Sequence, residues 1–163
     1  DAMLESDTFR FVRRSRRPPE NPINAMLSFG YALLTADCVS ALNTAGLDPA
    51  VGFLHPSRSA RPALALDLME ELRAVWVDRM VLAMVRRAQV TPGDFESMPT
   101  GEVRMRDEAR KRFLVEYQTR KREAVTHPLT QQATTWAMVP FVQARLLARA
   151  LRGEGEYVPF LLR

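Results

Sequence analysis

Apolar side chains recur every three or four residues along most of this 163-residue chain, which is the spacing of one face of an α-helix. The first such stretch begins at Asn21, a good helix cap, and Pro22 follows at a position where a missing N–H does no harm. Gly46 ends it. The inward positions are Ile23, Met26, Leu27, Leu34, Ala41 and Leu42. The pattern predicts a long helix between Asn21 and Gly46.

Three further helices are predicted by the same spacing. They run from Leu66 to about Arg87, from Asp107 to near His127, and from Leu129 to Leu151. Pro140 is expected to kink or break the last one. Their inward positions are Met69, Leu72, Trp76, Met80 and Ala83, then Ala109, Phe113, Leu114 and Tyr117. Residues 47–62 and 91–101 carry the turn formers of loops, and residues 102–106 suit a short extended piece.

The fold class that follows is all-α, a single helical domain of four or more long helices. Residues 1–20 end in Pro18-Pro19 and are expected to form a basic linker, with residues 21–163 as the helical domain. The sequence contains neither a phosphate-binding glycine loop nor a Cys–His zinc spacing, so P-loop and Rossmann interpretations have no support.

Composition indicates where such a chain would work. The single cysteine, Cys38, excludes a disulfide framework and suits a reduced, cytoplasmic setting. The apolar runs are shorter than the roughly 20 residues that span a bilayer, and the first residues are not a charged-then-apolar signal. We therefore expect no membrane association, and we expect Cys38 to be a small buried hydrophobe.

Positive charge comes almost entirely from arginine. The net charge is +4, the isoelectric point is about 9.8, and every one of the 23 basic residues is arginine except Lys111 and Lys121. Arginine presents a planar fork suited to phosphate oxygens, which favours a nucleic-acid partner. A GC-rich coding sequence would produce the same bias without any function, so composition leaves both explanations open.

A candidate site lies where the loop before the second helix meets that helix. His55 lies in the loop, and Asp67, Glu70 and Glu71 are spaced three and four apart, so we expect them to be neighbours near the helix start. An imidazole and a carboxylate brought together can share a divalent metal ion. Acidic residues also favour the positive end of a helix dipole, so a purely structural role is the alternative.

The apolar flanks of Asp67 favour the functional interpretation. An unpaired carboxylate among Leu66 and Leu68 is unfavourable unless a metal or an arginine meets it. Arg58 and Arg61 lie in the same loop and could hold a phosphodiester, or could pair with Glu70 or Glu71. The other histidine, His127, is interpreted as a cap at a helix C-terminus, and Trp76, Tyr117 and Trp136 as core residues.

Three sequence blocks together resemble one known family. They are the run from Arg14 to Leu34, RSRRPPENPINAMLSFGYALL; the run from Ala45 to His55, AGLDPAVGFLH; and the run from Leu64 to Glu71, LALDLMEE. Tyr117-Gln118, Arg120-Lys121 and His127-Pro128 continue the match. The chain resembles the C-terminal domain of the CRISPR-associated spacer-acquisition integrases, the Cas-one family, and most of all the type I-C or Cas-four-fused versions.

The resemblance implies a metal-dependent DNA integrase and endonuclease that inserts short DNA segments as spacers into a CRISPR array by phosphodiester transesterification. It implies that His55 and Glu70 bind Mg²⁺ or Mn²⁺, with Asp67 completing the catalytic set. The implied partners are double-stranded DNA of prespacer and repeat, a second copy, the small Cas-two subunit and a Cas-four nuclease. The resemblance also implies a DNA contact at Arg58. We expect Arg61, in the same loop, to contact the DNA as well, and the linker arginines to hold its backbone; these are Arg13, Arg14, Arg16 and Arg17.

Family members also have an N-terminal β domain and a metal-binding glutamate on a helix before the arginine-rich linker. Residues 1–13 match neither, so the chain is expected to be a fragment that lacks one ligand. The competing hypothesis is a non-catalytic helical module that binds DNA or a partner and uses Asp67 and Glu70 only as acids at a helix start. A chelator would distinguish the two, because the module would keep its binding.

Overall fold

The computed structural model describes residues 9, 13–15, 18–56 and 61–161. Its helices are α1 (Pro22–Thr44), α2 (Ala63–Arg73), α3 (Arg79–Arg86), α4 (Asp107–Arg122) and α5 (Val139–Leu151). A π-helical segment, η1 (Ala74–Asp78), joins α2 to α3, and two short 3-10 turns are η2 (Pro92–Asp94) and η3 (Trp136–Met138). The strands are β1 (Phe95–Ser97), β2 (Val103–Met105), β3 (Ala124–Thr126) and β4 (Ala133–Thr135). The largely helical architecture confirms the predicted fold class.

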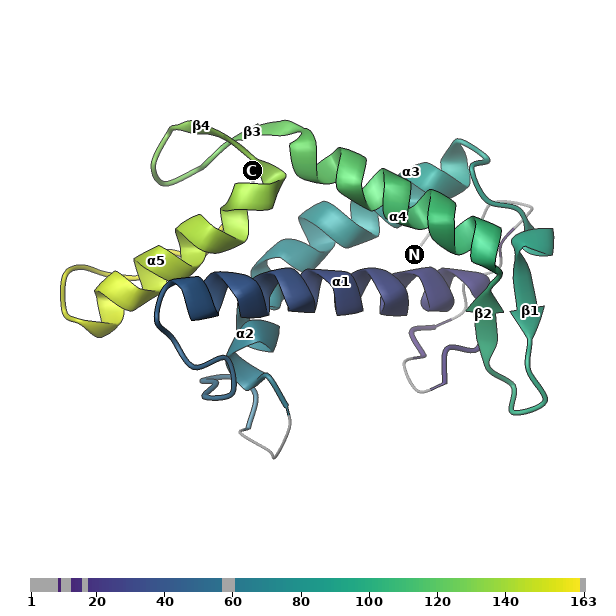
Figure 1. The fold of residues 1–163 in the computed structure, drawn as a ribbon, viewed down its shortest axis with the longest axis horizontal. Helices are drawn as coiled ribbons and strands as arrows, with labels where there is room; N and C mark the ends of the chain where they lie inside the picture. The colour runs from purple at the N-terminus through teal and green to yellow at the C-terminus, as the bar shows by residue number, and fades with distance from the viewer. Residues whose placement is uncertain (1–8, 10–12, 16–17, 57–60, 162–163) are drawn as a thin grey trace.

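Helix α1 forms the centre of the fold, and α2 and α5 pack against it (Figure 1). Asn21 caps its start by accepting a hydrogen bond from the N–H of Asn24 at 2.9 Å, and Pro22 occupies the first turn, as predicted. Gly46 adopts a positive φ of 76° just beyond its end. The predicted bounds of this helix are therefore confirmed.

Among the described residues, α1 is the one helix long and apolar enough to cross a membrane by length and composition alone. The prediction that no apolar run is long enough to span a bilayer is therefore wrong for α1, by length and composition. In the structure, Met26, Leu34, Cys38 and Leu42 of this helix are fully buried in the protein core, which accounts for its apolar character.

The second predicted helix is confirmed as the succession α2, η1 and α3, although it starts at Ala63 rather than Leu66. The π segment adds one residue to the helical turn between α2 and α3. Its residues Trp76 and Val77 are both fully buried. Trp76 stacks on Tyr117 with ring centroids 5.3 Å apart and contacts Trp136 at 5.6 Å. The predicted core roles of these three aromatic residues are confirmed.

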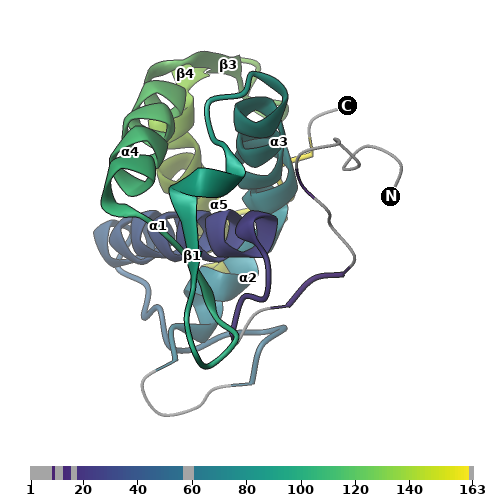
Figure 2. The same cartoon turned by 90° about the vertical axis from the view of Figure 1, so that its right-hand side faces the viewer.

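The remaining predictions were partly wrong, because two antiparallel hairpins replace expected loop or helix. β1 pairs with β2 through Phe95 and Met105 at one end of α1, where only the second strand had been expected (Figure 2). β3 pairs with β4 through Ala124 and Thr135, so α4 ends at Arg122 instead of continuing to the region of His127. β-branched residues in 124–126 and 133–135 favour this pairing.

The last helix is shorter than predicted. It begins only at Val139, so Pro140 lies in its first turn, where its missing N–H breaks no hydrogen bond. The predicted helical stretch before Pro140 and a kink at this residue are therefore wrong, because the α-helix starts beside Pro140. Beyond Leu151, the chain turns back and buries Phe160 against Trp136 and His127, with ring centroids 5.7 Å and 5.3 Å apart.

The described part of residues 1–20 packs on α1 and on the β1–β2 hairpin. Phe9 is buried against Phe95, and the carbonyl of Pro19 accepts a hydrogen bond from the N–H of Val103 at 2.8 Å. Ser15 accepts hydrogen bonds from the N–H of Glu20 and the side-chain amide of Asn24, both at 2.9 Å. This stretch is in contact with the helical domain.

Candidate active site

The loop of residues 51–56 is held against α2 by one carboxylate. Asp67 accepts hydrogen bonds from the backbone N–H groups of Phe53 at 2.6 Å, and of Leu54 and His55 at 3.0 Å each. The Nδ1 atom of His55 lies 2.6 Å from the same carboxylate. Asp67 thus collects four donors while only 9% of its side chain is exposed. A metal ion or an arginine was expected to meet this carboxylate. In the described part of the structure, its partners are instead three backbone N–H groups and the ring of His55.

Two features of the sequence make this contact possible. Gly52 passes so close to α2 that a Cβ atom there would lie 2.8 Å from Ala63 and 2.9 Å from Asp67. The carbonyl of Pro49 accepts a hydrogen bond from the N–H of Leu64 at 2.8 Å, which satisfies a free donor at the start of α2. The loop is therefore bound to α2 at two places, by the Pro49–Leu64 hydrogen bond and by the hydrogen bonds to Asp67.

The hydrogen bonds set the charge of Asp67. Burial alone would raise its pKa, but the N–H of Leu54, the ring of His55 and the N–H groups of Phe53 and His55 together lower it below the usual value. The ionised carboxylate places the proton of a neutral His55 ring on Nδ1. The Nε2 lone pair then points away from Asp67 and is available for a metal ion or a proton.

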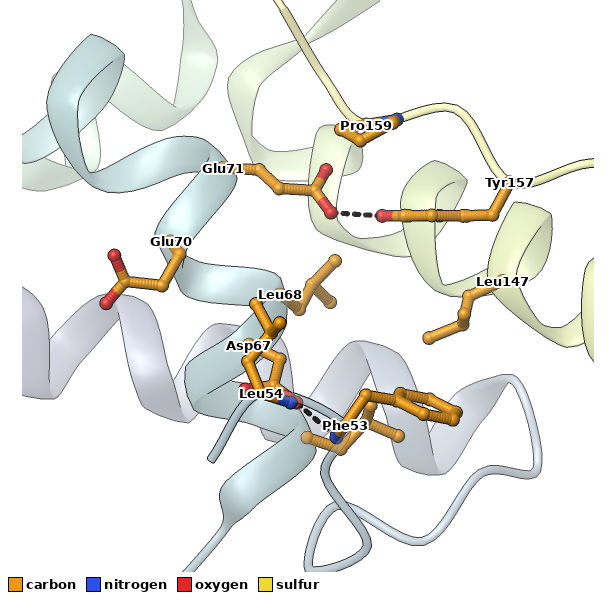
Figure 3. Close-up of a pocket in the computed structure, with 10 residues that line it drawn as sticks. Phe53, Leu54, Asp67, Leu68, Glu70, Glu71, Leu147, Tyr157 and Pro159 are labelled. Carbon is orange, nitrogen blue, oxygen red and sulfur yellow. Dashed lines mark hydrogen bonds between the residues drawn. The ribbon is translucent and has the colours of Figure 1, made fainter. Parts of the chain in front are cut away.

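Glu70 and Glu71 leave α2 in different directions, as Figure 3 makes visible. Glu70 forms an ion pair with Arg73 one turn along the helix, with nitrogen–oxygen distances of 3.1 Å and 3.0 Å, and remains about one third exposed. Glu71 accepts hydrogen bonds from the hydroxyl of Tyr157, from the Gln143 amide at 2.7 Å and from the N–H of Phe160 at 2.8 Å. The three carboxylates therefore have three separate sets of partners.

The prediction that these carboxylates lie at the start of the helix is wrong. Because α2 begins at Ala63, Asp67 is its fifth residue, and the first turn contains no acidic side chain. The helix-dipole explanation for Asp67 and Glu70 loses its basis, since the dipole acts within the first turn.

A cavity of about 470 Å³ opens beside these residues (Figure 3). Asp67, Glu70 and Glu71 contribute polar groups to an otherwise apolar lining. The apolar walls are Phe53, Leu54, Leu64, Leu68, Leu147 and Pro159, with Tyr157 at one side. Phe53 and Leu54 are 66% and 76% exposed, so the loop next to His55 presents apolar side chains to whatever occupies the cavity.

The predicted arginines are placed differently from one another. Arg13 is mostly exposed and lies 3.7 Å from Glu20. Arg14 donates to the side chains of Asn24 at 2.9 Å and Ser28 at 3.1 Å, so its guanidinium faces α1. Arg61 is half-buried immediately before α2. The positions predicted at Arg16, Arg17 and Arg58 lie outside the described residues.

The prediction for His127 is wrong. This residue lies in the loop of the β3–β4 hairpin and is 1% exposed. Its Nε2 faces the side-chain oxygen of Gln143 at 3.0 Å, and its Nδ1 accepts from the N–H groups of Leu129 and Thr130. It is a buried structural histidine whose ring nitrogens are both engaged. Cys38, in contrast, is buried as expected.

The partly exposed carboxylate of Glu70 is a donor type that suits hard divalent cations such as Mg²⁺ and Mn²⁺, and the imidazole of His55 is a donor type that binds several divalent metals. Among the residues that the structure describes, no group of three or more histidine, cysteine or acidic side chains could hold a metal ion. His55 and Glu70 offer one ring nitrogen and one partly exposed carboxylate, two donor types that leave most positions around such an ion to water or other oxygens.

The sequence matches known proteins along its whole length. The family model described as "CRISPR associated protein Cas1" matches residues 1–119. A CRISPR-associated endonuclease Cas1 of Moorella thermoacetica is 51% identical over 161 residues, covering 98% of this chain and 47% of the relative. One from Rhodospirillum rubrum is 52% identical over 151 residues, covering 93% and 44%. A Cas4/Cas1 fusion of Geobacter sulfurreducens is 44% identical, covering 90% and 26%.

Solved structures agree with these matches. A casposase bound to its integration product superposes with a TM-score of 0.85 at 27% identity, covering 97% of this chain and 47% of that one. A Cas1 protein from Thermotoga maritima gives 0.86 at 28% identity, covering 97% and 48%. A partial Cas6-RT-Cas1–Cas2 complex gives 0.80 at 28% identity, covering 99% and 48%.

The chain belongs to the Cas1 family of CRISPR-associated proteins. It spans about half the length of the curated relatives that it matches. The resemblance found in the sequence is confirmed, and the two arginine-poor blocks that carried it contain the loop and the helix of the candidate site.

Proposed function

We propose that the protein containing this chain is a metal-dependent DNA integrase and endonuclease, which joins short DNA segments into a CRISPR array by phosphodiester transesterification. Family membership supports the reaction class, and so do a relative named as an endonuclease and a structural neighbour bound to an integration product. The single observation that carries the proposal is the contact between His55 and Asp67 on the helix that also carries Glu70.

In this proposal each residue has one task. Asp67 fixes the loop and keeps the Nδ1 proton of His55 on its own side, so that Nε2 faces outward. His55 and Glu70 would hold Mg²⁺ or Mn²⁺. The ion, when bound, would polarise the phosphodiester and stabilise the negative charge that develops on its oxygens. The apolar side chains of Phe53 and Leu54 border the site on the side of the loop.

Basic residues would hold the DNA backbone. Arg13 and Arg61 are the described arginines best placed for this among those predicted, because neither guanidinium is buried in the core. Backbone contacts of this kind neutralise phosphates, so binding would weaken steeply as salt is added. Arg14, in contrast, would stabilise the approach of the N-terminal segment to α1.

The proposed partners follow from the names of relatives and neighbours. A complex of Cas1 with Cas2 and a fusion of Cas4 with Cas1 support association with both of these proteins. A homodimer and double-stranded DNA of prespacer and repeat complete the set. We place the reaction in the cytoplasm, in line with the sequence expectation.

The test is a strand-transfer assay with Mn²⁺ on the natural full-length protein. We expect His55→Ala and Glu70→Gln to lower integration by at least about 100-fold, which is the upper end of the loss caused by removing an outer-shell partner of a metal ligand. The matched control is Glu108→Gln, which changes a carboxylate that is 73% exposed and far from the site in sequence. Integration by this control should match the parent.

The helical binding module makes the opposite prediction. If His55→Ala and Glu70→Gln integrate DNA as well as the parent does, or if chelation leaves all DNA-dependent activity unchanged, the proposal is wrong. Retained DNA binding in the inactive variants would show that only the chemical step was lost.

A further inference from the structure

Glu70, the proposed helical ligand, is already engaged by a cation of the protein itself. Both of its carboxylate oxygens face Arg73, with Nη1 at 3.1 Å from Oε1 and Nη2 at 3.0 Å from Oε2. This is the two-point fork that arginine forms with carboxylates and phosphates. A metal ion that uses either oxygen must therefore displace at least one guanidinium N–H group.

The pair is poised for such an exchange. The two side chains are 33% and 31% exposed, and exposed ion pairs contribute little because water competes for both partners. An oxygen–metal bond to a divalent ion is stronger than one N–H hydrogen bond at this exposure. The pair is thus strong enough to hold Glu70 in one place and weak enough to yield.

Arg73 also interacts electrostatically with a second acidic residue, Asp78. Asp78, at the end of the π segment, accepts a hydrogen bond from the hydroxyl of Tyr31 at 2.5 Å. Burial raises the pKa of Asp78 and of Tyr31, while the charge of Arg73 lowers both, so the guanidinium lies near this pair as well as near Glu70. A guanidinium released from Glu70 therefore keeps favourable electrostatic surroundings beside the site.

We propose that Arg73 acts as a metal-released latch, which holds Glu70 in the metal-free protein and is displaced when Glu70 binds the divalent ion, so that its freed guanidinium contacts the DNA phosphate at the reaction centre. This inference rests on the proposed function. It assigns to Arg73 a substrate-binding role that exists only in the metal-loaded state. Arginine suits this role because the same planar fork fits a carboxylate and a phosphate.

The latch has an unusual signature, because one substitution moves two measurements in opposite directions. Arg73→Gln removes the competitor for Glu70, so Mn²⁺ should bind more tightly, by about fivefold or less, the range set by the strength of an exposed ion pair. The same change removes the phosphate contact, so strand transfer at saturating Mn²⁺ should fall by about tenfold or more. Arg73→Lys keeps the positive charge but loses the planar two-point contact of the guanidinium. Its Mn²⁺ affinity and its strand-transfer rate should both lie between those of the parent and Arg73→Gln.

The experiment measures Mn²⁺ binding by calorimetry and strand transfer in the full-length protein, with thermal melting to confirm folding. The matched control is Arg79→Gln, an exposed arginine of the next helix that forms no ion pair within the described part of the chain. It should leave both measurements at the parent values. Opposite shifts for Arg73→Gln, together with an unchanged control, support the latch.

Two results would overturn it. If the parent binds Mn²⁺ in a His55-dependent way but Arg73→Gln binds it equally or more weakly, Arg73 does not compete for Glu70 and the latch is wrong while the metal site stands. If the parent shows no His55-dependent Mn²⁺ binding, the proposed function fails and the latch falls with it.

Discussion

Asp67→Asn is the substitution that tests the site most directly. Asp67 accepts two hydrogen bonds on Oδ2, from Phe53 and Leu54, and two on Oδ1, from the backbone and ring of His55. Asparagine keeps one oxygen and replaces the other with an NH₂ group, which cannot accept from either N–H of the pair it would face. One of the two donor pairs is therefore lost in any orientation of the amide.

The magnitude follows from these lost bonds. Hydrogen bonds to a charged group contribute about 1.5–3 kcal/mol each, so losing two would remove about 3–6 kcal/mol in a fully buried site. The neighbouring side chains Phe53 and Leu54 are largely exposed, so water can reach the freed donors once the loop opens. We therefore expect the free energy of loop opening to fall by about 2–4 kcal/mol, which is about 30- to 1000-fold in the opening equilibrium.

Amide hydrogen exchange measured by NMR at residues 53–55 is the assay. Protection of these three amides should fall by that factor, while the core of α1 keeps its protection. The matched control is Asp48→Asn, because Asp48 lies in the same loop and accepts one exposed hydrogen bond, from Ala50 at 2.9 Å. Equal protection in both variants at residues 53–55 would refute the assignment of Asp67 as the anchor of the loop.

The same variant affects the histidine. In the amide orientation that keeps the bonds to Phe53 and Leu54, the NH₂ group faces Nδ1 of His55 and moves the ring proton to Nε2, the atom proposed to bind the metal. We expect Mn²⁺ affinity of the full-length protein to fall by about 10- to 100-fold. Unchanged affinity would mean that Asp67 does not orient His55 for metal binding.

Three further predictions concern pH, packing and the C-terminal segment. Because the pKa of Asp67 is lowered in the folded protein, this carboxylate stabilises the loop fully above about pH 4, and the stabilisation is lost as the pH falls through the lower folded pKa. Amide protection of residues 53–55 should therefore fall at acidic pH in the parent, and Asp67→Asn should not show this pH dependence. Gly30→Ala should destabilise the whole domain by about 1–3 kcal/mol, because the new Cβ would lie 2.5 Å from Val77 Cγ1. The melting temperature should fall accordingly, and the double variant Gly30→Ala with Val77→Ala should recover much of the lost stability. Tyr157→Phe removes a hydroxyl donor to the Glu71 carboxylate and should cost about 1–3 kcal/mol, visible as faster proteolysis of the C-terminal segment; an unchanged rate would contradict the anchoring role of that hydroxyl.

Helices could be predicted from the sequence where local signals determine them. Asn21, Pro22 and Gly46 mark both ends of α1, and the observed bounds agree. The region after Arg122 could not be predicted in this way. Its β3–β4 pairing depends on residues seven to eleven positions apart that meet only through the hairpin, and periodicity cannot report such a partner.

The candidate site divides in the same manner. The proximity of His55 and Asp67 followed from a loop before a helix and from the apolar flanks of the carboxylate. Glu70 and Arg73 are three residues apart on one helix, so helical spacing alone is enough to predict their ion pair. The contact of Glu71 with Tyr157 spans 86 residues, so only the tertiary structure reveals it.

The central position of α1 has a consequence for how the protein is made. Its core partners include α2 and α5, and α5 is synthesised more than ninety residues after α1 ends. During translation, an apolar helix-forming segment is therefore outside the ribosome before the last part of its packing surface exists. The domain cannot complete its core until α5 emerges, so the nascent chain depends on chaperones, or on the early α1–α2 contact, to keep this segment from aggregating.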